Sequence, residues 1–212
     1  MNKKERLAEI TEILRPLYFG ARTELVYKTP FQLLGAVILS AQCTDSRVNA
    51  VTPELFGRYP GPRELAAAPL GEIERLVHSA GFYHSKALSL KQSAAAIMEK
   101  FGGRVPDTMD GLLSLRGVAR KTANVVLGEA FGKTEGFVVD THVKRLAWRM
   151  GFTGSADPVK IERDFMRQLD RADWRWFSMA LVLHGRRVCQ ARAPRCAQCP
   201  VIDFCLRRDV NK

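Results

Sequence analysis

The chain has 212 residues, of which 46% are hydrophobic and 26% charged, and these values exclude a disordered or low-complexity protein. The longest apolar run, residues 33–39, is too short to span a bilayer, and no signal-peptide pattern opens the sequence. The net charge of +11 favours a polyanion such as nucleic acid as the partner over charge that serves solubility alone. We therefore expect a soluble intracellular protein that does not contact membranes.

Helix signals begin early in the chain. Thr29, Pro30 and Gln32 form a capping box with proline at the first helical position, which predicts an apolar helix through Leu39. Further on, an apolar stretch at 111–115 ends in a glycine-containing turn, and a new helix is expected from about Ala119.

Three further helices are each expected to follow an aspartate N-cap. They are residues 141–150 between Asp140 and Gly151, a helix from Asp157 and Pro158 with Ile161, Phe165 and Leu169 on one face, and residues 174–184 between Asp173 and Gly185. The alternation typical of strands is almost absent, and Phe137, Val138 and Val139 are too few to build a sheet. The sequence predicts an all-α fold.

Four cysteines lie close together in the C-terminal part, as Cys189, Cys196, Cys199 and Cys205 in the spacing C-x6-C-x2-C-x5-C. Free thiols rarely cluster in this way and disulfides do not suit an intracellular chain, so the spacing predicts a metal site. Only the second and third cysteines form the close pair typical of zinc, which favours a 4Fe–4S cluster but leaves zinc open. Cys43 is expected to be a small core residue inside the first apolar helix.

A basic hairpin is the second signal. Residues 115–123 read Leu-Arg-Gly-Val-Ala-Arg-Lys-Thr-Ala, and the second helix of such a hairpin points its first amides outward, where they can hold a phosphate. Arg116, Arg120 and Lys121 add positive charge there. An ordinary hairpin with solvated basic residues is the alternative, and this stretch alone does not decide between them.

Together these motifs resemble the endonuclease III family of DNA glycosylases. The resemblance covers nearly the whole chain and rests on Leu-Ser-Ala-Gln-Cys-Thr-Asp at 39–45, Gly-Phe-Tyr-His-Ser-Lys at 81–86, Lys-Thr-Ala-Asn-Val-Val-Leu at 121–127, Val-Asp-Thr-His at 139–142 and the four cysteines. It implies two helical lobes with a DNA-binding cleft between them. Residues 22–133 would form a helical barrel, and residues 1–21 would join 134–212, which hold the 4Fe–4S cluster loop at 189–205.

The resemblance also implies an activity. Such an enzyme flips oxidised pyrimidines out of double-stranded DNA, removes them and cleaves the abasic site by β-elimination. Lys121 matches the amine that attacks the sugar and forms a Schiff base, and a positive neighbour such as Arg120 favours the neutral, nucleophilic amine. Asp140 matches the essential carboxylate, although aspartate before a helix is also a routine N-cap. We expect a monomer that is cytoplasmic and associated with the bacterial nucleoid.

The resemblance further implies which residues contact DNA. Gln42 and Phe82 match the residues that fill the gap left by the extruded nucleotide. Phosphate contacts are expected from the hairpin residues Arg116, Gly117, Val118, Ala119 and Arg120 and from Arg192 in the cluster loop, and a monovalent cation is expected on the carbonyls of Leu113, Leu115 and Val118.

Two departures from the family pattern concern the hairpin, which usually reads Leu-Pro-Gly-Val-Gly. Arg116 replaces the proline and Ala119 the second glycine, and an added Cβ there is expected to cost about 1 kcal/mol unless Arg116 compensates with a phosphate contact. Phe82 stands where an aliphatic wedge is common, which is expected to change the tolerated opposite base.

Two alternatives stay open beside a glycosylase with lyase activity. A monofunctional relative, such as the adenine glycosylase, shares the cluster and the aspartate. That relative lacks the lysine, however, and carries an extra C-terminal domain. The few residues after Cys205 in this sequence are expected to leave no room for such a domain. A non-enzymatic iron–sulfur DNA-binding protein is the other alternative, which the altered hairpin favours and which Lys121 and Asp140 argue against.

Overall fold

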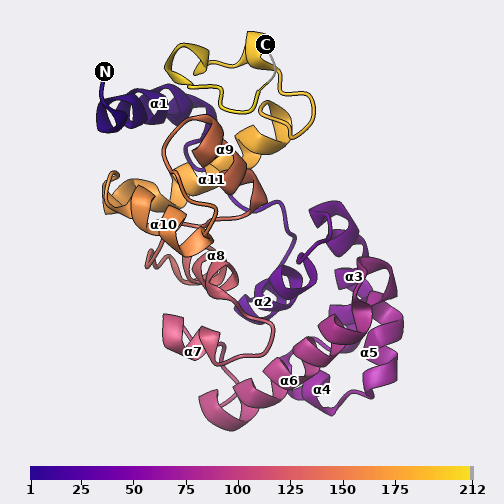
Figure 1. Cartoon of the computed structure of the whole chain (residues 1–212). Helices are drawn as coiled ribbons and strands as arrows, with labels where there is room; N and C mark the ends of the chain where they lie inside the picture. Colours follow the sequence, from indigo (N-terminus) through magenta and orange to yellow (C-terminus); the bar gives the residue numbers. More distant parts are fainter. Residues whose placement is uncertain (211–212) are drawn as a thin grey trace. The chain divides into compact units, whose positions relative to one another are not determined.

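A computed structural model describes residues 1–210, and these residues form helices and loops without any β-strand (Figure 1). The all-α prediction is confirmed. Within the described residues, no helix is long and apolar enough to cross a membrane. The chain divides into two compact units, one formed by Glu24–Lys133 and the other by Met1–Thr23 together with the chain from Thr134 onwards.

The unit of residues 24–133 is built around a buried central helix. Helix α2 (Pro30–Leu39) buries all its residues except Pro30 and Gln32, and it packs against α3, α6 and α8. A helix that is apolar on every side is stable only in such a surrounding. The surrounding elements are α3 (Asp45–Arg58), α4 (Pro62–Ala67), α5 (Leu70–Val77), the 3-10 helix η1 (His78–Ala80), α6 (Tyr83–Phe101), α7 (Met109–Leu113) and α8 (Arg120–Phe131).

The predicted start of α2 is confirmed, but its capping box is not closed. The Thr29 hydroxyl accepts the Gln32 N–H at 3.2 Å, as predicted. The Gln32 side-chain oxygen, however, accepts the N–H of Lys28 at 2.9 Å, instead of the N–H of Thr29. The cap therefore satisfies one amide inside the helix and one before it.

The prediction for Cys43 is wrong, because this residue follows the end of α2. The Ser40 hydroxyl donates to the Val37 carbonyl at 2.8 Å, and Gln42 adopts a left-handed backbone with a φ of +51°. Thr44 then caps α3 through the Arg47 N–H at 3.3 Å. Cys43 thus lies half-buried in the turn between two helices.

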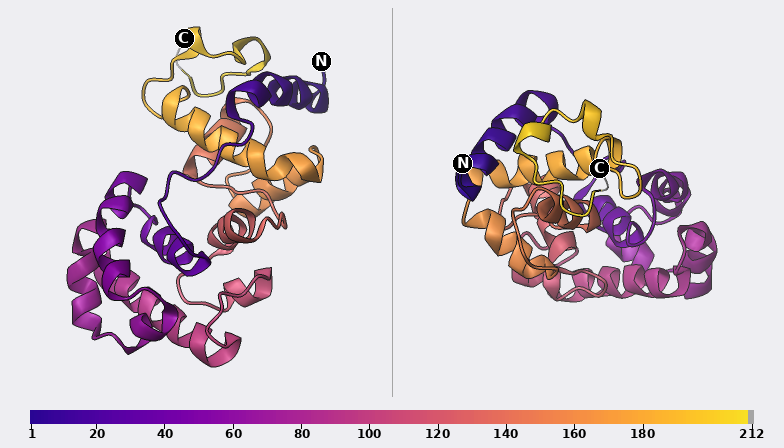
Figure 2. Two further views of the ribbon diagram at one scale, coloured as in Figure 1. Left: turned by 180° about the vertical axis from the view of Figure 1, so that it is seen from behind. Right: turned by 45° about the horizontal axis from the view of Figure 1, so that its top comes forward.

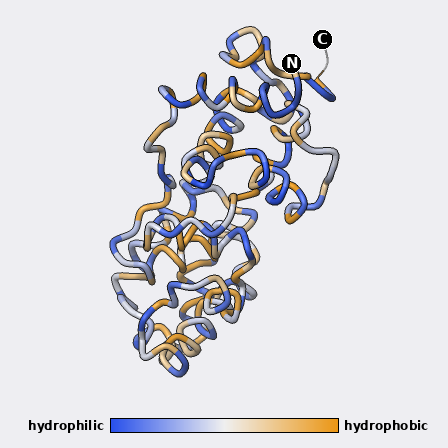
Figure 3. The backbone as a smooth tube through the Cα atoms, turned by 90° about the vertical axis from the view of Figure 1, so that its left-hand side faces the viewer, coloured by the Kyte–Doolittle hydropathy of each residue, from blue (hydrophilic) through white to orange (hydrophobic). Residues whose placement is uncertain are grey.

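The other unit packs its helices around α11 (Arg171–Arg187), which contacts α1 (Lys3–Tyr18), α9 (Thr141–Arg149) and α10 (Pro158–Met166). Figure 2 shows this unit from two further sides. Four fully buried phenylalanines fill its core, and the 3-10 helices η2 (Cys196–Gln198) and η3 (Ile202–Phe204) follow α11. The phenylalanines are Phe137, Phe152, Phe165 and Phe177. Colouring by hydropathy shows polar and apolar residues alternating along the helices, as is typical of helices with one buried face (Figure 3).

Two of the three predicted aspartate caps are confirmed. Asp140 accepts the Val143 N–H at 2.8 Å, and Asp157 accepts the Val159 N–H at 2.8 Å. Helix α9 ends one residue earlier than predicted, at Arg149. On α10, Ile161 and Phe165 are buried as expected, whereas Leu169 lies beyond the helix end but still packs against the core.

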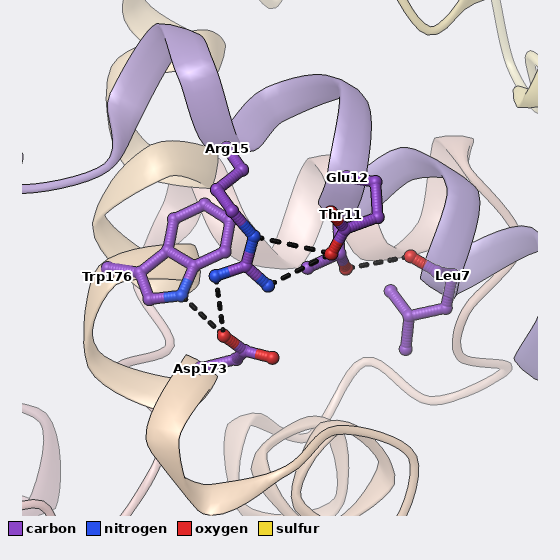
Figure 4. Close-up of polar contacts among 6 residues, drawn as sticks. All are labelled: Leu7, Thr11, Glu12, Arg15, Asp173 and Trp176. Carbon is purple, nitrogen blue, oxygen red and sulfur yellow. Dashed lines mark hydrogen bonds and ion pairs between the residues drawn. The ribbon is translucent and has the colours of Figure 1, made fainter.

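The third predicted cap, Asp173, is wrong, because its carboxylate is used elsewhere. One carboxylate oxygen accepts the Trp176 indole N–H at 2.7 Å and pairs with Arg15 of α1 at 3.2 Å (Figure 4). The Arg15 guanidinium also lies 4.7 Å from the centre of the Trp176 ring and bonds Glu12 at 3.0 Å. These contacts join α1 to α11, which begins at Arg171, before Asp173.

The predicted stop at Gly185 is also wrong, since α11 continues to Arg187. Gly185 serves close packing: a Cβ at this position would lie 2.9 Å from the Cβ of His142 on α9. A glycine inside a helix lowers its stability by about 1 kcal/mol relative to alanine, and here it allows two helices to approach.

Candidate functional site

The predicted hairpin between α7 and α8 is present and depends on Gly117. This residue has a φ of +77°, and a Cβ on it would lie 2.9 Å from both the Cβ and the hydroxyl of Ser89. The Ser93 hydroxyl donates to the Arg116 carbonyl at 2.7 Å, which fixes the turn to α6. The Val118 N–H closes the turn on the Leu115 carbonyl at 3.2 Å. The turn therefore requires glycine at this position.

Helix α8 begins with amides that no side chain caps. Its N-cap residue is Ala119, which offers no side-chain acceptor to the first turn, so this turn can receive an anion. The backbone of Ala119 is extended, with φ −94° and ψ 171°, a conformation that any residue adopts. The backbone of Ala119 is therefore unstrained, and the expected crowding of a phosphate by its Cβ stays a prediction. Lys121 lies in this first turn and is half-buried.

The Arg116 side chain, which is expected to compensate through a phosphate contact, is exposed and donates to the Gln92 side chain on α6 at 3.1 Å. Of the carbonyls expected to hold a cation, that of Leu115 already accepts the Val118 N–H and keeps one lone pair. Leu113 ends α7. The cation site stays a prediction.

Asp140 is a helix cap whose carboxylate has a second oxygen. The cap uses Oδ1, on the Val143 N–H, and Oδ2 stays available for another contact. Asp140 also influences His142 two residues later: burial lowers the pKa of His142, and the negative charge of Asp140 acts in the opposite direction. The half-buried carboxylate thus lies beside the imidazole of His142 and the guanidinium of Arg145.

The four C-terminal cysteines line one cavity, together with side chains of α9 and α11. All four are half-buried and none is in a disulfide. Burial raises the pKa of the Cys199 thiol to about 11, and it also raises the pKa of Cys205. Thiolates at these two positions therefore need positive charge beside them.

Two arginines of α9, not anticipated from the sequence, fix the loop that carries these cysteines. Arg149 is buried and donates to the carbonyls of Gln190 and Ala191 at 2.7 and 2.8 Å and to the Cys189 sulfur at 3.4 Å. Arg145 donates to the Cys189 carbonyl at 2.9 Å. Their spacing of four residues places both on one face of α9, which is the only signal the sequence offers.

His184 of α11 is a further residue beside the cysteines that the sequence did not reveal. It is fully buried between the Tyr18 hydroxyl, 3.3 Å from Nδ1, and the Cys199 sulfur, 3.4 Å from Nε2. Burial lowers the pKa of His184 to about 4, so the neutral ring can accept from Tyr18 and donate to the sulfur. N–H groups directed at sulfur ligands are typical of iron–sulfur sites.

The donor set fits a cluster better than a single ion. Within residues 1–210, no three His, Cys, Asp or Glu side chains are arranged to hold one metal ion, yet four cysteines surround one cavity. A cluster of several iron atoms spreads its ligands over more space than one zinc ion does. Soft thiols and N–H donors from Arg149 and His184 suit such a group.

The other predicted DNA contacts lie on exposed turns. Gln42 and Phe82 are exposed in the unit of residues 24–133, where both have left-handed backbones. Arg192 is exposed between the first two cysteines of the other unit, next to the carbonyl that Arg149 holds. Lys121 belongs to the first of these units and Asp140 to the second.

Comparisons with known proteins identify the family of this chain. A family described as HhH-GPD superfamily base excision DNA repair protein matches residues 36–171. Endonuclease III of Synechocystis is 53% identical over 204 residues, covering 96% of this chain and 93% of the relative, and that of Bacillus subtilis is 44% identical over 186 residues, covering 87% and 84%.

Among solved structures, a trapped covalent intermediate of endonuclease III with DNA superimposes with a TM-score of 0.92 at 38% identity, over 97% of this chain and 96% of the other. A non-covalent endonuclease III–DNA complex matches with the same score and identity. Because the similarity extends along nearly the whole chain, from the first helix to the cysteine loop, this protein is a member of the endonuclease III family within the HhH-GPD superfamily of base excision DNA repair proteins.

Proposed function

We propose that this chain removes oxidised pyrimidines from double-stranded DNA and cleaves the resulting abasic site. The observation that carries the proposal is the position of Lys121, in the uncapped first turn of α8 directly after the Gly117 hairpin. An amine at this position stands beside a turn suited to holding a DNA phosphate. Membership of a base excision repair family supports the same activity.

The proposed reaction starts when the target nucleotide leaves the base stack, since the sugar C1′ cannot be reached inside a duplex. The neutral Lys121 amine attacks C1′, the bond from C1′ to the base breaks, and the base departs with the bonding electrons and takes a proton from the amine. The C1′–O4′ bond then breaks and opens the sugar ring, O4′ takes up a proton, and the nitrogen lone pair completes the Schiff base. The resulting Schiff base acidifies the 2′ proton, and its removal breaks the bond to the 3′ phosphate by β-elimination.

Asp140 would supply the negative charge for this reaction. Positive charge develops on the sugar as the base leaves, and a carboxylate stabilises it. The N-cap bond through Oδ1 holds the side chain in place, while Oδ2 serves the chemistry. The two roles of Asp140 are thus compatible.

We propose that the two compact units are the two lobes of the family, with the hairpin and the cysteine loop as the DNA-binding elements. The loop 189–205 would carry a 4Fe–4S cluster on Cys189, Cys196, Cys199 and Cys205. When bound, the cluster supplies iron–sulfur bonds that fix the loop, and it takes no part in the cleavage steps. Arg192 is then held by the loop where it meets a phosphate.

The partner is DNA that contains damaged pyrimidines or abasic sites, and we propose that the protein acts on it as a monomer. The trapped and non-covalent complexes of the related endonuclease III with DNA support this partner. Because the relatives compared are bacterial, we propose that the protein works in the cytoplasm at the nucleoid.

Borohydride trapping on a thymine-glycol duplex tests the proposal, because only a Schiff base is reduced to a stable adduct. Wild-type protein should form a one-to-one covalent adduct and cut the strand. The Lys121→Gln variant should bind the duplex but form no adduct. Base release without an adduct in the wild type would indicate a monofunctional glycosylase, and binding without base release would indicate a non-enzymatic protein.

A further inference from the structure

Two exposed turns of the unit of residues 24–133 share an uncommon backbone. Gln42 and Phe82 have φ values of +51° and +47°, and the Phe82 side chain is 66% exposed. A left-handed conformation is rare and strained for a bulky residue, so it persists only where the surrounding structure holds it.

Lys86 fixes the turn of Phe82 at two points. Its backbone N–H donates to the Phe82 carbonyl at 3.1 Å, in the first turn of α6. Its side-chain ammonium reaches back and donates to the Ala80 carbonyl at 2.7 Å, at the end of η1. The strained residue is therefore held from both sides by one lysine, since Ala80 precedes it and α6 follows it.

Helix α3, which follows the turn of Gln42, packs against η1, which precedes the turn of Phe82. Burial lowers the pKa of Lys86, while Cys43, the residue after Gln42, acts on it in the opposite direction. The packing of α3 on η1 therefore joins the Gln42 turn to the element that Lys86 holds.

Burying this ammonium is costly, because within residues 1–210 no carboxylate pairs with it and the residue is only 5% exposed. An apolar side chain of similar length would fill the same space without that penalty. A buried polar group of this kind is expected to specify one local conformation. Here that conformation is the left-handed Phe82 turn.

We propose that Lys86 is a positioning residue that holds the Phe82 and Gln42 turns in the shape needed to enter a stacked duplex. The inference rests on the proposed function and on the expectation from the family resemblance that these two side chains fill the gap left by the extruded nucleotide. Such replacement is needed only where a base must leave a stack, because single-stranded DNA offers its sugar directly. Loss of Lys86 should therefore impair cleavage of duplex DNA and spare cleavage of single strands.

The test compares cleavage at one thymine glycol in duplex and in single-stranded DNA. For Lys86→Met we expect the ratio of duplex to single-strand rate to fall by about tenfold, equal to about 1.4 kcal/mol, which lies within the strain that one residue stores. Phe82→Ala should lower the same ratio. Lys86→Arg, which keeps the donor and the charge, should recover most of it.

Lys91→Met is the matched control. Lys91 lies on α6 as well, and its ammonium also donates to backbone carbonyls, those of Ala66 at 2.8 Å and Ala68, far from the Phe82 turn in sequence. Its loss should lower stability without changing the ratio. If Lys86→Met does not fold, Lys86→Gln keeps a polar end that is too short for Ala80, and the same fall in the ratio is expected.

Two results would overturn the inference and leave the proposed function intact. One is an unchanged ratio in the Lys86 variants while Phe82→Ala lowers it, which would make Lys86 structural only. The other is an unchanged ratio in Phe82→Ala, which would show that Phe82, the residue that Lys86 is proposed to position, does not fill the gap in the duplex. Failure of the wild type to cleave or be trapped on either substrate would instead reject the function and the inference together.

Discussion

Substitution of Gly117 by alanine tests the hairpin most directly. Two effects add at this position. The φ of +77° places a side chain in the left-handed region, and the new Cβ would lie 2.9 Å from the Cβ and the hydroxyl of Ser89. Ser89 is buried on α6 and belongs to the helix itself, so neither partner can move aside without shifting α6 or the turn.

The expected loss follows from these two effects. A left-handed L-residue costs about 1–2 kcal/mol, and overpacking a buried contact costs about 1–3 kcal/mol. The free energy of unfolding should therefore fall by about 2–5 kcal/mol, and at about 2–4 °C per kcal/mol the melting temperature should fall by about 4–20 °C.

Gly132→Ala is the matched control, because Gly132 follows the other end of α8. Its φ is +66°, but a Cβ there would meet nothing within 4 Å. Only the left-handed cost of about 1–2 kcal/mol remains. Thermal unfolding followed by circular dichroism gives the two stabilities, and titration of an abasic-site duplex gives the two affinities.

We expect Gly117→Ala to be the less stable variant and to bind the duplex more weakly, while Gly132→Ala keeps the affinity of the wild type. Equal losses of stability in the two variants would show that the contact with Ser89 relaxes without cost. Unchanged DNA affinity in a folded Gly117→Ala protein would show that the turn does not hold a phosphate.

Asp140→Asn should keep its helix cap and its melting temperature while base release collapses, since asparagine caps about as well as aspartate; full glycosylase activity in this variant would leave Asp140 a cap alone. Cys189→Ser should lose iron and sulfide, whereas Cys43→Ser should retain about four of each per chain by chemical analysis, and stoichiometric zinc in native protein would contradict the cluster. DNA affinity should fall with salt at a log–log slope near −4.5 for about five phosphate contacts, and a flat slope would contradict a phosphate-based interface. Burial lowers the pKa of His184 from 6.5 to about 4, so its contribution to stability is full above pH 6.5 and is lost as the pH falls towards 4. His184→Gln should therefore weaken the dependence of the free energy of unfolding on pH between 6.5 and 4, measured by denaturant titration. An unchanged dependence would show that other groups cause the sensitivity to acid.

The sequence predicted those elements whose hydrogen bonds are local. Asp140 and Asp157 cap their helices through amides two or three residues away, so the pattern alone identifies them. Asp173 has the same pattern but lies inside α11, which begins at Arg171. Its carboxylate pairs with Arg15, a residue that is distant in the sequence. No local pattern contains such a competitor.

The residues that surround the candidate site could not be predicted from the sequence for the same reason. The bonds of Arg149 to the cysteine loop and of Lys86 to Ala80 come from tertiary packing, and both residues look like ordinary surface cations in the sequence. The four cysteines were visible because their ligand set is contained in one short segment. The family resemblance identified Lys121, whereas supporting residues such as Arg149 and Lys86 could be recognised only from the fold.

Helix α9 carries two parts of the proposed site. Asp140 begins this helix and Arg149, which holds the cysteine loop, ends it, about 14 Å away at 1.5 Å per residue. Because both residues are fixed to one short helix, a substitution that shifts α9 along its axis would displace the carboxylate and the anchor of the loop together.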